Sequence, residues 1–249
     1  MEKAALWLRI TAKAPAGHGS IPSPNSSVER LLSALERLRR WETPIEVLPA
    51  VAQGYRMRAA RQNDPVLRRA YADLEKSLHD PALRKKLLAD STLNAEVRNT
   101  FTITGLKGSD KVNVIPGTAS AQIDARLLPG ETPDDFIAKL RRVLNDPELE
   151  IEVLEGSTPT GSEAETALMN AIRKVAARRD PDVPVIPTML TSSTDSAKFR
   201  PLGITAYGFE PFKLDDNELG RSHGDDERVS LENVRFALQF LYEVVVELN

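Results

Sequence analysis

The chain has 249 residues, no cysteine and a formal net charge of −3, with 41% hydrophobic and 28% charged residues. These proportions are those of a globular protein with one large or two small domains, and the slightly acidic balance argues against nucleic acid or an anionic membrane as a partner. The absence of cysteine excludes disulfides, thiolate metal sites and a cysteine nucleophile, so any metal ligands must be His, Asp or Glu. No apolar run reaches the roughly 20 residues of a membrane span, and the first residues show no signal-peptide pattern. Together with the lack of cysteine, this leads us to expect a cytoplasmic protein.

The first 40 residues predict a strand, a glycine-rich loop and a helix. Residues 6–12 alternate in polarity and are rich in β-formers, which predicts a strand. The loop 17–22 reads Gly-His-Gly-Ser-Ile-Pro, and its His18 lies between two glycines, so no neighbouring Cβ shields its ring. The tripeptide alone favours a tight loop with a solvated histidine. The leucines that follow have helical spacing and predict an amphipathic helix capped by Ser26 or Ser27.

Residues 44–97 differ in character and predict a helical insertion. Asp64-Pro65 and Asp80-Pro81 each have the pattern of a helix start, with proline at the first helical position. We therefore expect two helices, over residues 66–78 and 82–88. His79 lies between them, and we expect it to be structural.

Residues 99–154 predict the remainder of a small sheet. Strands are expected over 99–104, 119–127 and 149–154, and a helix over 134–144. The resulting order is strand–helix–strand–strand–helix–strand. It describes an α+β fold in which two helices cover one face of a four-stranded antiparallel sheet.

The loop 156–161 contains two glycines and a proline and predicts a domain boundary. Beyond it we expect a helix over 163–178, strands near 185–190 and 204–209, and a last helix over 231–248. The spacing of apolar residues in that helix predicts a buried face formed by Val234, Leu238, Leu241 and Val245.

Two groups of residues are candidates for chemistry. His223 is surrounded by acidic residues, and a neutral imidazole beside carboxylates is a plausible metal ligand, although a surface loop fits the same pattern. One histidine falls short of the three or four ligands that a zinc ion requires. Asn113 and Arg126 lie on adjoining strands, where an amide and a guanidinium could hold a carbonyl oxygen and a carboxylate. A surface ion pair of Arg126 with Asp124 or Glu131 is the alternative.

Four motifs in order give a specific resemblance. They are Leu-Trp-Leu-Arg with Gly-His-Gly-Ser, Lys-Val-Asn-Val-Ile-Pro-Gly, Asp-Ala-Arg-Leu-Leu-Pro-Gly, and Ser-Thr-Asp-Ser with Ser-His-Gly-Asp-Asp-Glu. Together they resemble the co-catalytic zinc aminoacylase/carboxypeptidase family, which includes acetylornithine deacetylase, succinyl-diaminopimelate desuccinylase and glutamate carboxypeptidases. The helical insertion and the Asn-Thr-Phe-Thr segment are most similar to the branch of carboxypeptidase S and the N-acyl-amino-acid hydrolases.

The resemblance implies a lid or dimerisation domain over residues 4–156, with the insertion at about 44–97, and then the C-terminal part of a zinc-peptidase α/β catalytic domain over 157–249. It also implies roles for single residues. His18 would stabilise the oxyanion in the active site of a partner subunit. The implied substrate-binding residues are Asn113, Arg126, Ser193 and Thr194. The implied last zinc ligand is His223. A complete site would hold two zinc ions and attack an amide with zinc-activated water.

The sequence departs from the family in one large respect. The motifs that carry the other zinc ligands and the general base, His-x-Asp and Glu-Glu, do not precede Met1. We therefore expect part of an amidohydrolase acting on small peptides or N-acyl amino acids, inactive alone, that forms a homodimer through its lid or associates with a missing N-terminal half. A non-catalytic dimerisation or partner-binding module is the alternative. An unrelated α/β binding protein is disfavoured, because four ordered matches are hard to obtain by chance.

Overall fold

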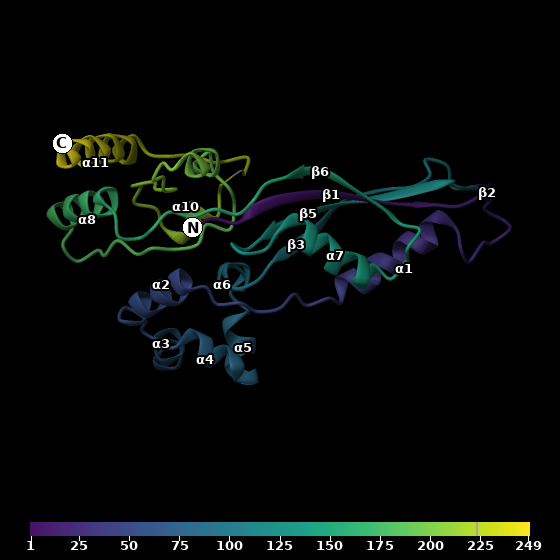
Figure 1. The fold of residues 1–249 in the computed structure, drawn as a ribbon, viewed down its shortest axis with the longest axis horizontal. Coiled ribbons are helices and arrows are strands. Elements are labelled where there is room, and N and C mark those ends of the chain that lie inside the picture. Colours follow the sequence, from purple (N-terminus) through teal and green to yellow (C-terminus); the bar gives the residue numbers. More distant parts are fainter. Residues whose placement is uncertain (223) are drawn as a thin grey trace.

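The centre of the molecule is a four-stranded antiparallel sheet with the strand order β3-β5-β1-β6 (Figure 1). A computed structural model describes residues 1–222 and 224–249. The four strands are β1 (Ala4–Lys13), β3 (Thr100–Lys107), β5 (Thr118–Leu127) and β6 (Glu150–Gly156). With one helix after β1 and one before β6, the chain has the split βαβ arrangement of a ferredoxin-like fold. The predicted α+β fold is confirmed.

Two helices, α1 (Ser27–Arg39) and α7 (Pro133–Leu144), cover one face of this sheet (Figure 1). Alternate residues of the two central strands point toward them and are buried, because successive side chains of a strand face opposite sides. The main core consists of these residues and the apolar stripes of the two helices: Leu6, Leu8, Ile10, Ala121, Ile123, Ala125, Leu127, Leu31, Leu35, Leu38, Phe136, Leu140 and Leu144. Ser26 caps α1, as predicted, through a hydrogen bond from the backbone N–H of Glu29.

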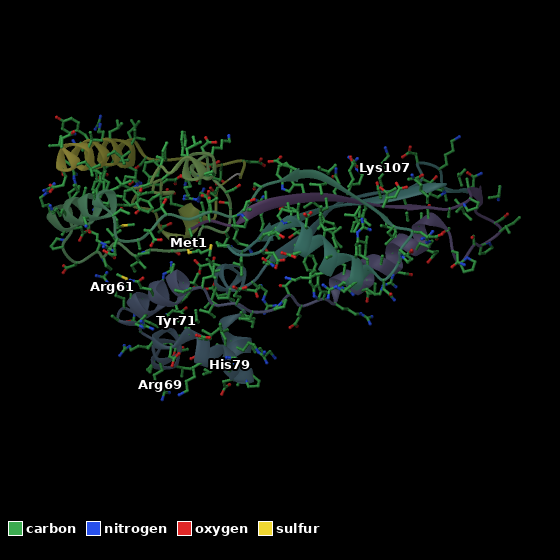
Figure 2. The ribbon with its side chains drawn as sticks, in the orientation of Figure 1. Met1, Arg61, Arg69, Tyr71, His79 and Lys107 are labelled. Atoms are coloured by element: carbon green, nitrogen blue, oxygen red, sulfur yellow. The ribbon has the colours of Figure 1, made fainter. Side chains whose placement is uncertain are left out.

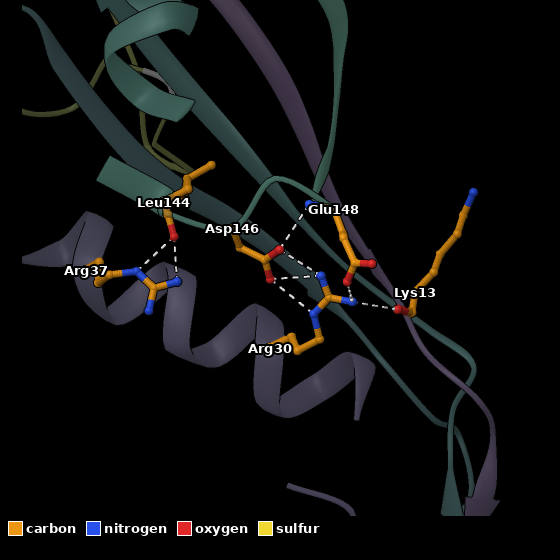
Figure 3. Close-up of polar contacts among 6 residues, drawn as sticks. All are labelled: Lys13, Arg30, Arg37, Leu144, Asp146 and Glu148. Atoms are coloured by element: carbon orange, nitrogen blue, oxygen red, sulfur yellow. Dashed lines mark hydrogen bonds and ion pairs between the residues drawn. The ribbon is translucent and has the colours of Figure 1, made fainter. Parts of the chain in front are cut away.

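A cluster of polar contacts joins α1 to the loop between α7 and β6 (Figure 3). Arg30 donates to both carboxylate oxygens of Asp146, at 2.7–3.0 Å, and to the carbonyl oxygen of Lys13 at 3.1 Å. Its guanidinium also pairs with Glu148 at 2.9 Å. Arg37 donates two hydrogen bonds to the carbonyl oxygen of Leu144 at the end of α7. These contacts fix the two helices to each other and to the end of β1.

We expect Asp146→Asn to lower the free energy of unfolding at pH 7 by about 2 kcal/mol, because it removes the charge from a mostly buried, two-point contact. The hydrogen bonds from Arg30 lower the pKa of Asp146 below its ordinary 3.8. The pair therefore stabilises the fold above that pH, and its contribution is lost as the pH falls through the lowered value. Urea unfolding at pH 7 and pH 3 measures this: the difference from wild type should shrink at pH 3. Asp195→Asn, in a fully exposed pair with Lys198, is the control and should change stability little.

The insertion contains five helices, α2 (Pro49–Ala59), α3 (Pro65–Ala72), α4 (Leu74–His79), α5 (Pro81–Leu87) and α6 (Ser91–Glu96). The prediction of one helix over 66–78 is wrong. The backbone of Asp73 is not helical, and its side chain accepts a hydrogen bond from the N–H of Lys76, so Asp73 ends α3 and caps α4. The predicted helix at 82–88 is confirmed as α5, while α2 and α6 were not predicted. His79 ends α4 at an exposed position of the insertion (Figure 2).

The insertion contacts the segment 185–190 of the last hundred residues. A Cβ on Gly54 of α2 would lie 2.6 Å from the carbonyl oxygen of Pro187, so this close approach requires glycine. The buried carboxylate of Glu96 accepts hydrogen bonds from Tyr55 at 2.7 Å and from Thr188 at 2.9 Å. The insertion therefore joins the sheet domain to the C-terminal residues.

The C-terminal residues form α8 (Ala167–Arg179), α9 (Ser196–Phe199), a 3-10 turn (Arg200–Leu202), α10 (Asp216–Leu219) and α11 (Leu231–Leu248). Within the described chain, the predicted strands near 185–190 and 204–209 do not form. A strand needs a neighbour for its N–H and C=O groups, and here only isolated bridges occur, between Glu2 and both Thr160 and Leu190.

The last helix has the predicted bounds but not the predicted buried face. Ala237, Phe240 and Val244 are buried, and α11 packs on α8 through this face. Leu238 and Val245, which were predicted to be buried, are 65% and 58% exposed, and Leu241 is exposed as well. The helix is apolar on more than one side, so periodicity alone did not distinguish the side that contacts α8.

Candidate functional site

His18 lies at the end of the sheet domain that is remote from α8 and α11 (Figure 1). There β2 (Gly17–His18) pairs with β4 (Val114–Ile115), which places His18 opposite Val114. The N–H of Gly19 donates to the carbonyl oxygen of Asn113 at 2.8 Å. A Cβ on Gly19 would lie 3.3 Å from that carbonyl group, so glycine permits the close approach of the two segments. We call residues 17–24 and 109–116 the lid tip.

The ring of His18 has a defined hydrogen bond on one nitrogen. Its Nδ1 accepts a hydrogen bond from the N–H of Ser20 at 3.1 Å and lies 2.8 Å from the Ser20 hydroxyl. Because Nδ1 accepts a backbone N–H, the ring proton of neutral His18 lies on Nε2. The residue is exposed, and so is Asn113 beside it. The structure thus places the segments of two predicted site residues, His18 and Asn113, next to each other.

Arg126 lies at the opposite end of β5 from the lid tip. It is opposite Ala5 on β1 and Thr100 on β3. Thr118 and Arg126 are eight residues apart on one strand, which corresponds to about 26 Å. The hypothesis that Asn113 and Arg126 hold one substrate together is therefore wrong within a single chain. Instead, Arg126 donates to both oxygens of Asp124, at 2.7 and 2.9 Å, the alternative that the sequence left open.

Thr194 and Ser193 lie near the joint between the sheet domain and the C-terminal residues. The hydroxyl of Thr194 donates to Glu2 at 2.8 Å, and Ser193 is exposed. Glu2 is buried and pairs with the equally buried Arg200 at 2.8 Å. Sequence reasoning missed Glu2 and Arg200, because an acidic and a basic residue 198 positions apart give no local signal of pairing.

Lys3 is a second buried charge at this joint that the sequence did not reveal. It is fully buried, and its ammonium group donates to the carbonyl oxygens of Ala95 and Arg98 and to the hydroxyl of Thr100, at 2.8–3.0 Å. It therefore joins the start of β1 to the end of the insertion and the start of β3. Burial, and to a lesser extent the charge of Arg126, lowers the pKa of Lys3 to about 7.

This pKa gives a prediction for stability. Above pH 7 the folded chain releases the Lys3 proton, whereas the unfolded chain holds it to about 10.5, so the unfolded state binds more protons and stability rises with pH. Relative to Lys3→Met, we expect the free energy of unfolding of the wild type to rise by about 2 kcal/mol between pH 7 and pH 9. Chemical denaturation of both proteins at several pH values measures this. Parallel pH profiles would contradict the assignment.

His223, the predicted metal ligand, lies outside the described residues. Among the residues that the structure describes, no three His, Cys, Asp or Glu side chains are grouped so that they could hold a metal ion. The carboxylate of Asp226 pairs with Arg221. The described residues therefore do not fit a metal centre. Within the same residues, no helix combines the length and apolar character needed to cross a bilayer.

Comparison with known proteins relates this fold to one family. Residues 1–152 match the M20 family model described as a peptidase dimerisation domain. The chain is 28% identical over 247 residues to "Probable carboxypeptidase S-like 2" of Dictyostelium discoideum, covering 98% of this chain and 47% of the relative. It is 29% identical over 248 residues to "N-fatty-acyl-amino acid synthase/hydrolase PM20D1" of Xenopus tropicalis, covering 98% and 48%.

A solved structure shows the same fold. The di-peptidase Dug1p of Saccharomyces cerevisiae superposes with a TM-score of 0.64 at 13% sequence identity, over 99% of this chain and 55% of that protein. The chain thus spans about half the length of the curated relatives reported above. The predicted family is confirmed: the chain belongs to the M20 peptidases, and it contains their dimerisation domain.

Proposed function

We propose that this chain is the lid and the C-terminal part of a zinc-dependent amidohydrolase that hydrolyses peptide or N-acyl amino-acid amide bonds. In this proposal residues 4–156 are the lid, with the insertion at about 44–97, and residues 157–249 belong to the catalytic domain. An N-terminal part would supply the zinc ligands that the described residues lack. The family and the double length of the relatives support this division.

The observation that carries the proposal is the lid tip. Two exposed polar residues, His18 and Asn113, lie in neighbouring segments that strand pairing and a backbone hydrogen bond hold together. An N–H on Nε2 of His18 is suited to donate to the oxygen of an amide as negative charge develops there. Asn113 would bind the substrate beside it. Ser193 and Thr194 would lie on the substrate side of the catalytic part, and His223 would be a zinc ligand.

The geometry supports a division of these roles between two chains. Strand β2, which contains His18, lies at one end of the sheet, and the N-terminus, where Thr194 contacts Glu2, lies near the other end (Figure 1). It would therefore act in the site of a partner subunit. Arg126, in contrast, lies near the joint, close enough to Lys3 to lower its pKa. It would bind a substrate carboxylate in the site of its own chain, with Asp124 orienting its guanidinium.

We propose that the homodimer forms through the edge of the sheet at β3. The outer strand β6 carries Glu150, Glu152 and Glu155, whereas β3 carries no charge from Thr100 to Leu106. Charged residues protect an edge from pairing, and two copies of β6 would bring acidic residues together. Thr102→Lys on β3 should therefore shift the dimer toward monomer, as measured by sedimentation across a dilution series. Val153→Lys on β6 is the control, and the reverse result would assign the other edge.

The function itself is tested by reconstitution. The chain alone should bind fewer than two zinc ions and should not hydrolyse N-acyl amino acids. Co-expression with an N-terminal part that contains His-x-Asp and Glu-Glu should yield two zinc ions per site and hydrolysis. Two tightly bound zinc ions on the chain alone would contradict the division into two parts.

A second candidate function is a non-catalytic dimerisation or partner-binding module. The match of residues 1–152 to a family model described as a dimerisation domain favours it. In that case the chain would dimerise, and no N-terminal part would confer hydrolysis. The same reconstitution experiment separates the two functions.

A further inference from the structure

A groove of about 600 Å³ runs along the lid tip, and Val114, which pairs with His18, is one of its lining residues. It lies between the segment that enters α1 and the loop before β5. Its lining is mainly apolar and includes Pro22, Val28, Val112, Val114, Ile115 and Pro116. Its polar lining residues include Glu29 and Lys111. A volume of this order is typical of sites for small molecules.

The groove is preformed rather than a gap between mobile loops. The hydroxyl of Ser27, at the start of α1, donates to the carbonyl oxygen of Pro116 at 2.7 Å and so joins the two walls. The far wall is a turn in which the N–H of Val114 donates to the carbonyl oxygen of Lys111. Two prolines, Pro22 and Pro116, further restrict the backbone. A ligand would therefore bind without having to order these walls.

Two apolar side chains of the lid tip are exposed and not packed in a core. Val112 is fully exposed, and Ile21 is 73% exposed. Single exposed apolar residues are common, but Val112 lines the groove together with Val114 and Ile115. Burial of this surface is favourable only when a ligand or partner occupies the groove.

The position of the groove indicates its occupant. Residues directly opposite each other on antiparallel strands project to the same face, so His18 and Val114 lie side by side. A substrate whose carbonyl oxygen meets Nε2 of His18 would thus have the substituent of that carbonyl next to Val114 and the groove. We propose that this lid-tip groove binds the aliphatic part of the substrate, an acyl chain or an apolar side chain, in the active site of the partner subunit. The inference rests on the proposed function and adds the element that selects the substrate.

The test measures direct binding to the full chain. The probes are N-acetylglycine, N-octanoylglycine and N-dodecanoylglycine below their micelle concentrations, observed through the methyl resonances of Val28, Val112 and Val114. Affinity should increase with chain length, by at least about tenfold from octanoyl to dodecanoyl, because each buried methylene adds to binding. Val112→Asp should remove this gain, and Val112→Ser should reduce it. Val183→Asp, an equally apolar exposed position outside the groove, should leave it unchanged.

Two results would overturn the inference. One is an affinity that does not depend on chain length. The other is a response confined to the methyl groups of the exposed face of α11, such as Val245, which would indicate non-specific binding of alkyl chains. In the reconstituted enzyme, Val112→Asp should raise the KM for N-dodecanoylglycine with little change in kcat. If the chain binds the probes in the groove but no reconstituted enzyme hydrolyses them, the proposed function is contradicted and the groove assignment stands. If the reconstituted enzyme hydrolyses them and Val112→Asp leaves the KM unchanged, only the groove assignment is contradicted.

Discussion

Mixing the His18→Ala and Arg126→Ala variants of the reconstituted enzyme should restore hydrolysis that neither variant shows alone. Each single variant should lose about 100-fold or more in kcat/KM, because each lacks a donor to the oxyanion or to the substrate carboxylate. In a mixed dimer, one site combines the intact Arg126 of its own chain with the intact His18 of the partner. The other site lacks both.

The size of the recovery follows from counting sites. Random association makes half of the dimers mixed, and each mixed dimer has one intact site, so we expect about one quarter of the wild-type rate. If His18 and Arg126 acted in the same chain's site, or if both acted in the partner's, every site of a mixed dimer would lack one of them. No recovery would then occur. A mixture of two separately prepared samples of His18→Ala is the control for exchange and must stay inactive.

The separation of His18 from Arg126 could not be predicted from sequence spacing. Asn113 and Arg126 are only thirteen residues apart, and a tight turn between two strands would have placed them together. Instead, Asn113 belongs to the turn at the lid tip, and β5 then runs the length of the sheet before it reaches Arg126. The direction of a strand after a turn decides which end of the sheet a residue reaches, and hydrophobic alternation does not contain this information.

The sheet domain itself was predictable because its local signals agree with one another. The alternating strands, the cap at Ser26 and the Pro133 helix start all indicate the same fold, and it forms. The C-terminal residues were predicted less well. Their apolar segments 185–190 and 204–209 have the composition of strands but have no neighbouring strand among the described residues. Lys3 and Glu2 were missed because a buried charge is determined by distant partners such as Arg98 and Arg200.

The double variant Leu238→Asp/Val245→Asp should abolish reconstitution with the N-terminal part. The reason is the surface of α11 that faces away from α8. Beside its contact with α8, α11 forms ion pairs with that helix: Glu243 pairs with Arg179, and Glu247 pairs with Lys174 and Arg178. The opposite side, where a solvated helix has polar residues, is instead apolar and exposed: Leu231, Leu238, Leu241, Tyr242, Val245, Val246 and Leu248.

This exposed face is the surface that the proposed N-terminal part would cover. Burial of a leucine or valine contributes about 1.5–3 kcal/mol, and a buried unpaired carboxylate opposes association more strongly still. We therefore expect the double variant to lose at least about 100-fold in affinity for the N-terminal part, measured by co-purification and by the hydrolysis recovered on titration. The chain alone should keep its thermal stability, because Phe240 and Val244 still pack on α8, and it should aggregate less.

A matched substitution distinguishes loss of an interface from general disruption. Val66→Asp changes a partly exposed apolar residue on α3 of the insertion, which lies apart from α11 (Figure 1), and it should leave reconstitution intact. If Leu238→Asp/Val245→Asp reconstituted as well as wild type, the apolar face of α11 would not be the contact, and the assignment of residues 157–249 to a larger catalytic domain would lose its main structural support. If neither Leu238→Asp/Val245→Asp nor Val66→Asp reconstituted, both substitutions would act by destabilising the chain, and the thermal measurement would show a lowered Tm. Loss of association by α11 variants at unchanged Tm is the result that the exposed apolar face requires.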